Sequence, residues 1–261
     1  MADELIRVNN SSYGKYEDLL IKRDALRKEA FQYDRAYIRE FGNLILELFE
    51  LKLDCIRKKK TIEYCQIFVN KGQSVDQDAL QAYLQKEMEE YQKQLDDMIK
   101  DNEAAKESHR ISEVDLLKIK RIYHRLVKKI HPDINPLTEE NDDLLCLWMR
   151  LKAAYNCNDL KEMEEVEVLV NLALEKLDLG TLEISIPDID EKIAEIEEEI
   201  EKIKNTDPYR YKYLLEDINA VKQKKEDLEK EIREYIEYGE QLDEILDGLM
   251  QKGVRFTWRM N

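Results

Sequence analysis

The chain has 261 residues, of which 58 are acidic and 42 are lysine or arginine, so its formal net charge is −16. Only 7 glycines and 4 prolines are present. This scarcity disfavours β-sandwiches, barrels and doubly wound α/β folds, which need frequent turns and Gly-rich crossings. Apolar residues make up 43% of the chain and are regularly spaced, which disfavours a disordered chain. The composition therefore predicts an all-α protein.

The sequence also carries expectations about environment. It holds no run of about 18 uncharged apolar residues, and its first residues lack the pattern of a signal peptide. We therefore expect a cytoplasmic protein that does not contact membranes. The acidic balance argues against nucleic-acid binding, which needs a basic surface. The four cysteines (Cys55, Cys65, Cys146 and Cys157) contain no CxxC pair, so we expect free thiols, no metal site and no cofactor.

The first segment, residues 1–107, is expected to form a helical stalk. Apolar residues recur in steps of three and four from Tyr16 to Val69, which is typical of a coiled-coil seam. A lone glycine costs a helix only about 1 kcal/mol, so Gly42 is compatible with a kink. Residues 43–70 and 76–104 are then expected to fold back at Gly72 as an antiparallel hairpin that buries both seams.

The last segment, residues 181–261, repeats this pattern. Asp188 is expected to cap a run of isoleucines that ends at Ile203, and Asp207 to cap a second helix with Pro208 in its first position. The second arm is much longer than the first. Its far half is therefore expected to pack against another part of the chain, and the N-terminal stalk is the obvious candidate.

Two short stretches alternate apolar and polar residues, 181–186 and 254–258. Both are compatible with β-strands that pair with each other, because an unpaired strand is not stable. An extended linker and a frayed tail explain them equally well.

The middle segment, residues 108–180, differs from its surroundings in charge. Residues 108–133 hold seven basic and three acidic side chains, a net charge of +4, whereas residues 134–206 carry a net charge of −13. A local reversal of sign in an acidic protein indicates a surface for an acidic partner. The alternative is an ordinary solvated helix face.

Two helices and a tight loop are expected within this segment. Ser112 and Asp115 form an S-x-x-D capping pattern, which predicts a helix from Glu113. The helix must end before Pro132, because the residue before a proline disfavours the α conformation. Thr138 is expected to cap the second helix. The predicted stripe of the first helix comprises Leu116, Ile119, Ile122, Tyr123, Leu126, Val127 and Ile130. The predicted buried face of the second comprises Leu144, Leu145, Trp148, Leu151, Ala154 and Tyr155.

These residues carry a family resemblance over roughly 112–160. The run from Ile119 to Asp133, IKRIYHRLVKKIHPD, resembles helix II and the His-Pro-Asp loop of the J-domain, the hallmark of DnaJ-type co-chaperones. In that family an Asn-Pro pair follows, and then a helix with an aromatic residue seven positions before Ala-Tyr. Here Asn135-Pro136, Trp148 and Ala154-Tyr155 occupy those places.

The resemblance implies a fold and a mechanism. It implies a J-domain-like helical hairpin set between long antiparallel coiled coils, with the stalk's second arm as a substitute for helix I. J-domains bind the ATP-bound form of a DnaK-type (seventy-kilodalton heat-shock) chaperone and stimulate its ATP hydrolysis. The residues that would bind this partner by match are His131, Pro132, Asp133, Tyr123, Lys120, Arg121, Arg125, Lys128 and Lys129. The coils would hold a client or a scaffold protein.

A second interpretation stays open, in which the chain is a structural or adaptor coiled-coil protein whose J-like fold stimulates nothing. Residues 100–111 lack the Tyr…Leu-Gly signature of the family's first helix, and Ile134 stands where Arg or Lys is usual. Taken alone, His131-Pro132-Asp133 is also an ordinary helix stop. No catalytic constellation is present, so we expect no enzyme. The sequence leaves the oligomeric state open.

Overall fold

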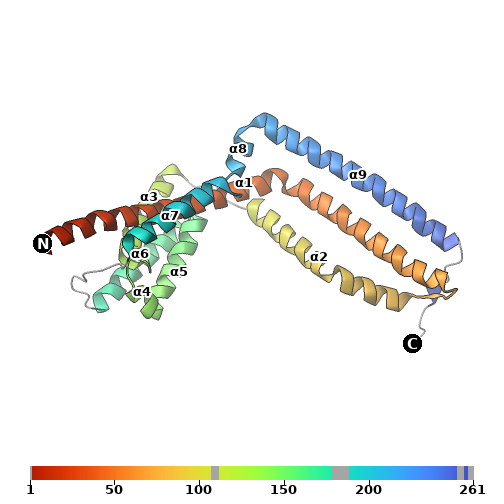
Figure 1. The fold of residues 1–261 in the computed structure, drawn as a ribbon, viewed down its shortest axis with the longest axis horizontal. Helices are drawn as coiled ribbons and strands as arrows, with labels where there is room; N and C mark the ends of the chain where they lie inside the picture. Colours follow the sequence, from red (N-terminus) through yellow and green to blue (C-terminus); the bar gives the residue numbers. More distant parts are fainter. Residues whose placement is uncertain (1, 107–111, 178–187, 252–255, 258–261) are drawn as a thin grey trace. The chain divides into compact units, whose positions relative to one another are not determined.

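The computed structural model describes residues 2–106, 112–177, 188–251 and 256–257, with side chains described from Ser12. The chain is all-α, as its composition predicts. The elements, in chain order, are α1 (Ala2–Asn70), β1 (Val75–Asp76), α2 (Gln77–Lys106), α3 (Glu113–Ile130), α4 (Leu137–Glu140), α5 (Asp142–Cys157), α6 (Leu160–Lys176), α7 (Ile189–Asn205), α8 (Tyr211–Glu216), α9 (Ile218–Gln251) and β2 (Phe256–Thr257) (Figure 1).

The chain forms two compact units, and each is discontinuous in sequence. The first unit contains residues 1–34 and 109–212, and the second contains residues 35–108 and 213–261. This division differs from the three consecutive segments that the sequence suggests. The reason is that α1 is one uninterrupted helix that contributes to both units, and Gly42 does not end it.

The core of the first unit is one apolar cluster to which α1, α3, α5, α6 and α7 contribute. Tyr16 and Leu20 of α1 lie in this cluster with Ile193 and Ile196 of α7, and each is at most 6% exposed. All but Leu116 of the predicted α3 stripe is buried, as is all but Leu145 of the predicted α5 face. Periodicity therefore identifies both inward faces.

In the second unit, α1 and α2 are joined by a turn at Gly72 and pack against each other. Gly72 has φ +64°, a left-handed conformation that glycine adopts without steric cost. One shared cluster contains Leu53 of α1 with Met88 and Leu95 of α2. This is the hairpin that the seams predict, and its two helices run side by side in Figure 1.

Helix α9 packs on the same part of α1. Phe41 and Leu48 of α1 form a cluster with Leu228 and Ile232 of α9. The expected packing of the long C-terminal arm on the stalk is therefore confirmed. The expected C-terminal hairpin is wrong, because α7 belongs to the first unit and α9 to the second.

The start of the C-terminal arm also differs from expectation. Pro208 follows a cis peptide bond and precedes the helix, which begins at Tyr211. The capping role expected of Asp207 falls instead to Asp217, whose Oδ1 accepts the N–H of Asn219 at 2.9 Å at the start of α9. Asp188 occupies the N-cap position of α7 but makes no side-chain capping bond.

Within the described residues there is one short parallel β pair, in which Val75 pairs with Phe256 and Asp76 with Thr257. The strand expected within 254–258 therefore forms, although its partner is β1. The other expected strand, 181–186, lies outside the described residues.

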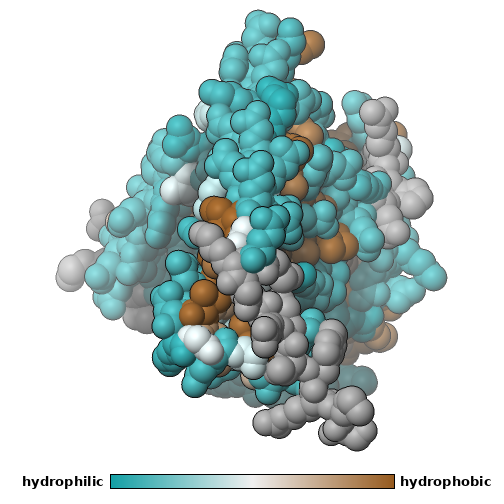
Figure 2. All heavy atoms as spheres, turned by 90° about the vertical axis from the view of Figure 1, so that its right-hand side faces the viewer, coloured by the Kyte–Doolittle hydropathy of each residue, from teal (hydrophilic) through white to brown (hydrophobic). Residues whose placement is uncertain are grey.

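The surface drawn in Figure 2 is mostly hydrophilic, with small separate hydrophobic areas. Among the described helices, none is long and apolar enough to cross a membrane.

Candidate partner-binding site

Helix α3 begins after a side-chain cap at Ser112 and ends at the residue before His131-Pro132. The Ser112 Oγ accepts the N–H of Asp115 at 3.1 Å, which is the predicted capping bond. At the other end, His131 is extended (φ −68°, ψ 127°), and its N–H still donates to Val127 at 3.0 Å. The following proline cannot continue the helix. The predicted bounds of α3 are therefore confirmed.

The beginning of the next helix is different. Thr138 lies inside the four-residue α4 and is buried, so the cap expected of it is wrong. Asn141 is extended and caps α5, because its Oδ1 accepts the N–H of Leu144 at 3.0 Å. An asparagine cap followed by Asp142 and Asp143 suits the positive end of the helix dipole.

The loop between α3 and α4 is held by its own hydrogen bonds. The His131 Nδ1 accepts the N–H of Asp133 at 3.1 Å. The Asn135 side-chain amide donates to the carbonyl of Lys129 at 2.9 Å, and its Oδ1 accepts the N–H of Leu137. The backbone N–H of Asn135 donates to the His131 carbonyl at 2.7 Å. These bonds fix the position of the loop relative to the end of α3.

The imidazole of His131 lies inside the first unit. The residue is 4% exposed, and its ring meets the Trp148 ring edge-on at 4.7 Å. Burial lowers the pKa of His131 to about 4, although Asp133 opposes the shift. The ring is therefore neutral at pH 7, with its proton on Nε2 and Nδ1 free to accept. Its separation of 3.8 Å from the Asp133 carboxylate is for that reason not an ion pair.

The other two residues of the motif are more accessible. Pro132 is half-buried, and the Asp133 side chain is 42% exposed. The corner thus presents a carboxylate to solvent, while the histidine beneath it fixes the backbone that carries that carboxylate.

The five cations of the predicted site, Lys120, Arg121, Arg125, Lys128 and Lys129, are all exposed along α3. Two of them bond to α6. Arg125 makes a two-pronged contact with Glu167 at 2.8 and 3.0 Å, and Lys129 donates to Asn171 at 2.7 Å. Exposed pairs of this kind contribute about 0.2–1 kcal/mol each, so a competing acidic partner can displace them.

The N-terminal part of α1 lies along the other side of α3 and brings acidic side chains to it. Glu17, whose side chain is 11% exposed, forms an ion pair with Lys128. This contact raises the pKa of Lys128 through a side-chain hydrogen bond. Burial lowers the pKa of His124, and so do Lys120 and Lys128, whereas the carboxylates of Asp18 and Glu17 raise it. At this edge of the cationic face, acidic side chains of the same chain therefore already neutralise part of the positive charge.

The expectation that the His131 ring touches a partner is corrected, because that ring is buried, and Tyr123 does not fit its predicted role either. It is 1% exposed, stacks on Tyr155 with ring centroids 3.8 Å apart, and donates from its hydroxyl to Asp24 of α1 at 2.7 Å. The expectation that Tyr123 touches a partner is corrected here, because α1 covers it. Tyr123 is a core residue of α3, and its hydrogen bond to Asp24 connects α3 to α1.

The helix that packs against α3 and α5 is also not the expected one. The stalk's second arm, α2, ends at Lys106 in the second unit. The N-terminal part of α1 contributes Tyr16, Leu20 and Leu26 to the core that contains α3 and α5. That part of α1, which lies more than 80 residues upstream of α3, takes the place that the sequence interpretation gave to α2.

Sequence reasoning missed three α1 residues in this region, Glu17, Asp24 and Lys28, which are 8%, 8% and 4% exposed. Their spacing carries a signal, since they fall on the same face as Leu20 within a helix of apolar periodicity. Charged residues at such positions are almost never buried unless they have partners. Within the described residues, no cluster of His, Cys, Asp or Glu is suited to a metal.

Comparison with known proteins returned no matching family model, no matching curated protein and no matching solved structure.

Proposed function

We propose that α3, the His131–Asp133 corner and α5 form a J-domain-like module that binds the ATP-bound form of a DnaK-type chaperone and stimulates its ATP hydrolysis. The observation that carries the proposal is the row of five exposed cations on α3, which leads to the exposed carboxylate of Asp133. The resemblance over 112–160 supplies the identity of the partner.

The proposal gives each part of the site a role. The cations steer and orient an acidic surface of the partner, because complementary potentials raise association rates more than they raise affinity. Asp133 makes the decisive polar contact. His131 is a positioning residue, since its buried ring accepts the N–H of Asp133 and packs on Trp148. The chain itself performs no chemistry, and it shifts a two-state partner toward hydrolysis.

The second unit would hold the client or a scaffold protein on its long antiparallel helices. The exposed apolar side chains of α9 support this part of the proposal, with Ile236 at 43% and Ile245 at 50% exposure. Four free cysteines fit the reducing conditions of the cytoplasm, where DnaK-type chaperones act.

Binding tests the proposal most simply. We expect the chain to bind an ATP-bound, hydrolysis-deficient DnaK-type chaperone in surface plasmon resonance and to bind its ADP form more weakly. Asp133→Asn should weaken binding at least tenfold, because it removes a charge and leaves the backbone bond to His131 intact. Asp143→Asn, at an exposed position of α5, is the matched control and should change binding less than twofold. Absence of binding, or equal binding by Asp133→Asn, would contradict the proposal.

A second candidate is an adaptor with a J-like fold that does not stimulate hydrolysis. The observation that favours it is the cover that α1 places on α3, because Tyr123 is buried and Lys128 is already paired with Glu17. A chain that binds the chaperone without accelerating hydrolysis would be this adaptor.

A further inference from the structure

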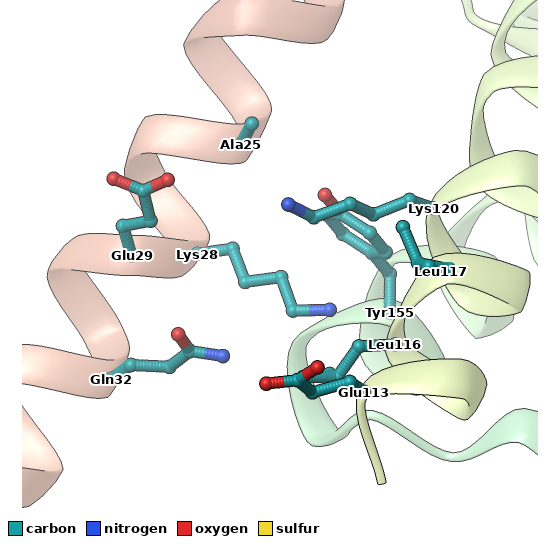
Figure 3. Close-up of a pocket in the computed structure, with 9 residues that line it drawn as sticks. All are labelled: Ala25, Lys28, Glu29, Gln32, Glu113, Leu116, Leu117, Lys120 and Tyr155. Carbon is teal, nitrogen blue, oxygen red and sulfur yellow. The ribbon is translucent and has the colours of Figure 1, made fainter. Parts of the chain in front are cut away.

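A pocket of about 340 Å³ lies within the first unit, between the α1, α3 and α5 helices. Figure 3 shows the Lys28 side chain reaching across it from α1 and the Lys120 side chain entering from α3, with the Tyr155 ring between them. Ala25, Leu116 and Leu117 supply apolar surface to the same pocket. The proposed function uses Lys120 but gives no role to Lys28 or to this pocket.

Lys28 is the unexplained group. The residue is 4% exposed, and its ammonium has no hydrogen-bond partner in the described structure. The Nζ lies 3.8 Å from the centre of the Tyr155 ring, a cation–π contact that offsets part of the cost of burial. A buried charge normally requires an ionic partner as well, because removal from water costs several kcal/mol per ion.

The surroundings of Lys28 disfavour its charged form. Burial and, to a smaller extent, the charge of Lys120 lower the pKa of Lys28 to about 8, and only Cys157 acts in the opposite direction. Two carboxylates line the pocket, those of Glu29 and Glu113, yet neither forms an ion pair with Lys28 in the described structure. Figure 3 shows the Glu29 carboxylate directed away from the Lys28 ammonium.

These groups define the chemistry of a fitting ligand. An anion between Lys28 and Lys120 would satisfy the orphaned ammonium and relieve the repulsion between the two cations. Glu29 and Glu113 add two negative charges, so a monoanion is favoured over a dianion such as phosphate. The apolar surface favours an apolar body. A volume of about 340 Å³ has room for a small organic anion.

We propose that this pocket binds a small monocarboxylate with a short apolar or aromatic body, whose carboxylate is held by Lys28 and Lys120. The Gln32 amide at the same pocket is a further donor for the second carboxylate oxygen. The proposal is independent of chaperone binding, since it rests on the buried ammonium and the shape and charge of the pocket.

Isothermal titration calorimetry tests the proposal, with benzoate and hexanoate as probes and benzamide and inorganic phosphate as comparison compounds. The monocarboxylates should bind saturably to the full chain, and both comparison compounds at least tenfold more weakly. Lys28→Met retains the apolar stem and removes the charge, so it should weaken benzoate binding at least tenfold without unfolding the chain. Lys22→Met, at an exposed position of the same helix, should change binding less than twofold.

Proton uptake gives a second readout. Because binding favours the charged form of Lys28, benzoate should bind with net proton uptake at pH 8, seen as a binding enthalpy that varies with the ionisation enthalpy of the buffer. The titratable groups around Lys28 are Lys120, Tyr155, Glu113 and Glu29, which line the same pocket, and Cys157, which acts on it electrostatically. Lys28→Met should abolish most of this uptake. The proposal fails if neither monocarboxylate binds saturably, if benzamide binds as well as benzoate, or if folded Lys28→Met binds normally.

Discussion

The hydrogen bond between Tyr123 and Asp24 is the contact that most directly tests how α1 docks on α3. The Tyr123 hydroxyl donates to Asp24 Oδ2 at 2.7 Å, and the other carboxylate oxygen accepts from Arg23 at 3.2 Å. Asp24 is 8% exposed, so water cannot replace a lost donor. Burial raises the pKa of Tyr123 above its usual range, so the hydroxyl is protonated at neutral pH and can donate.

Tyr123→Phe removes this donor and preserves the ring that stacks on Tyr155. A hydrogen bond to a charged group contributes about 1.5–3 kcal/mol, and a buried acceptor left without a partner costs a similar amount. We therefore expect the free energy of unfolding of the first unit to fall by about 2 kcal/mol. Urea denaturation followed by Trp148 fluorescence measures it, in a Trp258→Phe background that leaves Trp148 as the single tryptophan.

The control is Tyr213→Phe, which alters a tyrosine that is 62% exposed in the second unit and should leave the Trp148 transition unchanged. A double-mutant cycle with Asp24→Asn isolates the pair, and its coupling energy should be at least about 1 kcal/mol. A loss below about 0.5 kcal/mol for Tyr123→Phe would refute the reasoning, because α1 would then not be fastened to α3 by this bond.

Three further predictions concern the loop, the cationic face and the α1–α2 turn. His131 has a pKa of about 4 in the folded chain and about 6.5 when unfolded, so the unfolded state binds more protons in this window and stability falls as pH drops from 6.5 to 4. Between pH 7 and pH 5 the loss is about 2 kcal/mol, and it should be missing from His131→Asn in urea titrations at those two pH values. Glu17→Gln releases Lys128 and should raise the association rate with an acidic partner severalfold at low salt, an effect that 0.5 M salt should abolish in stopped-flow measurements. Gly72→Ala should destabilise the second unit by about 1–2 kcal/mol, because a φ of +64° strains any residue with a Cβ atom. No atom lies near the added methyl group, so the backbone strain is the whole cost. Gly72→Asn should cost less, and equal stability of all three proteins in urea denaturation would contradict the left-handed conformation of this turn.

The sequence predicts the local part of this structure well. The cap at Ser112, the end of α3 before Pro132 and the buried stripes of α3 and α5 follow from rules that span a few residues. The same holds for the glycine turn at Gly72. In each case the periodicity or the backbone preference acts within one or two helical turns, so no knowledge of tertiary contacts is needed.

The long-range part could not be predicted in the same way. The partner of α3 is the N-terminal part of α1, and the Tyr123 hydroxyl reaches Asp24, 99 positions away. An apolar seam shows that a helix face is buried but does not identify the helix that covers it. The isoleucines of α7 illustrate the same point, because their seam fits a C-terminal hairpin as well as it fits the cluster of the first unit that they join.

The same distinction between local and long-range structure explains why only part of the candidate site could be predicted. A run of cations on one helix face is a local property, and all five are exposed as that pattern indicates. Periodicity places Tyr123 in the apolar stripe of α3, and the spacing of Lys28 relative to Leu20 carries a similar signal. The contacts that both side chains make depend on how α1 packs against α3 and α5, which local pattern alone does not show.

The most direct test of the central claim is a single-turnover measurement of ATP hydrolysis by a DnaK-type chaperone at saturating concentrations of this chain. We predict a rate at least tenfold above that of the chaperone alone, with the acceleration lost in Asp133→Asn and kept in Asp143→Asn. A rate equal to the unstimulated one, or equal acceleration by Asp133→Asn, would contradict the claim that the exposed carboxylate at the end of the cationic helix triggers the partner.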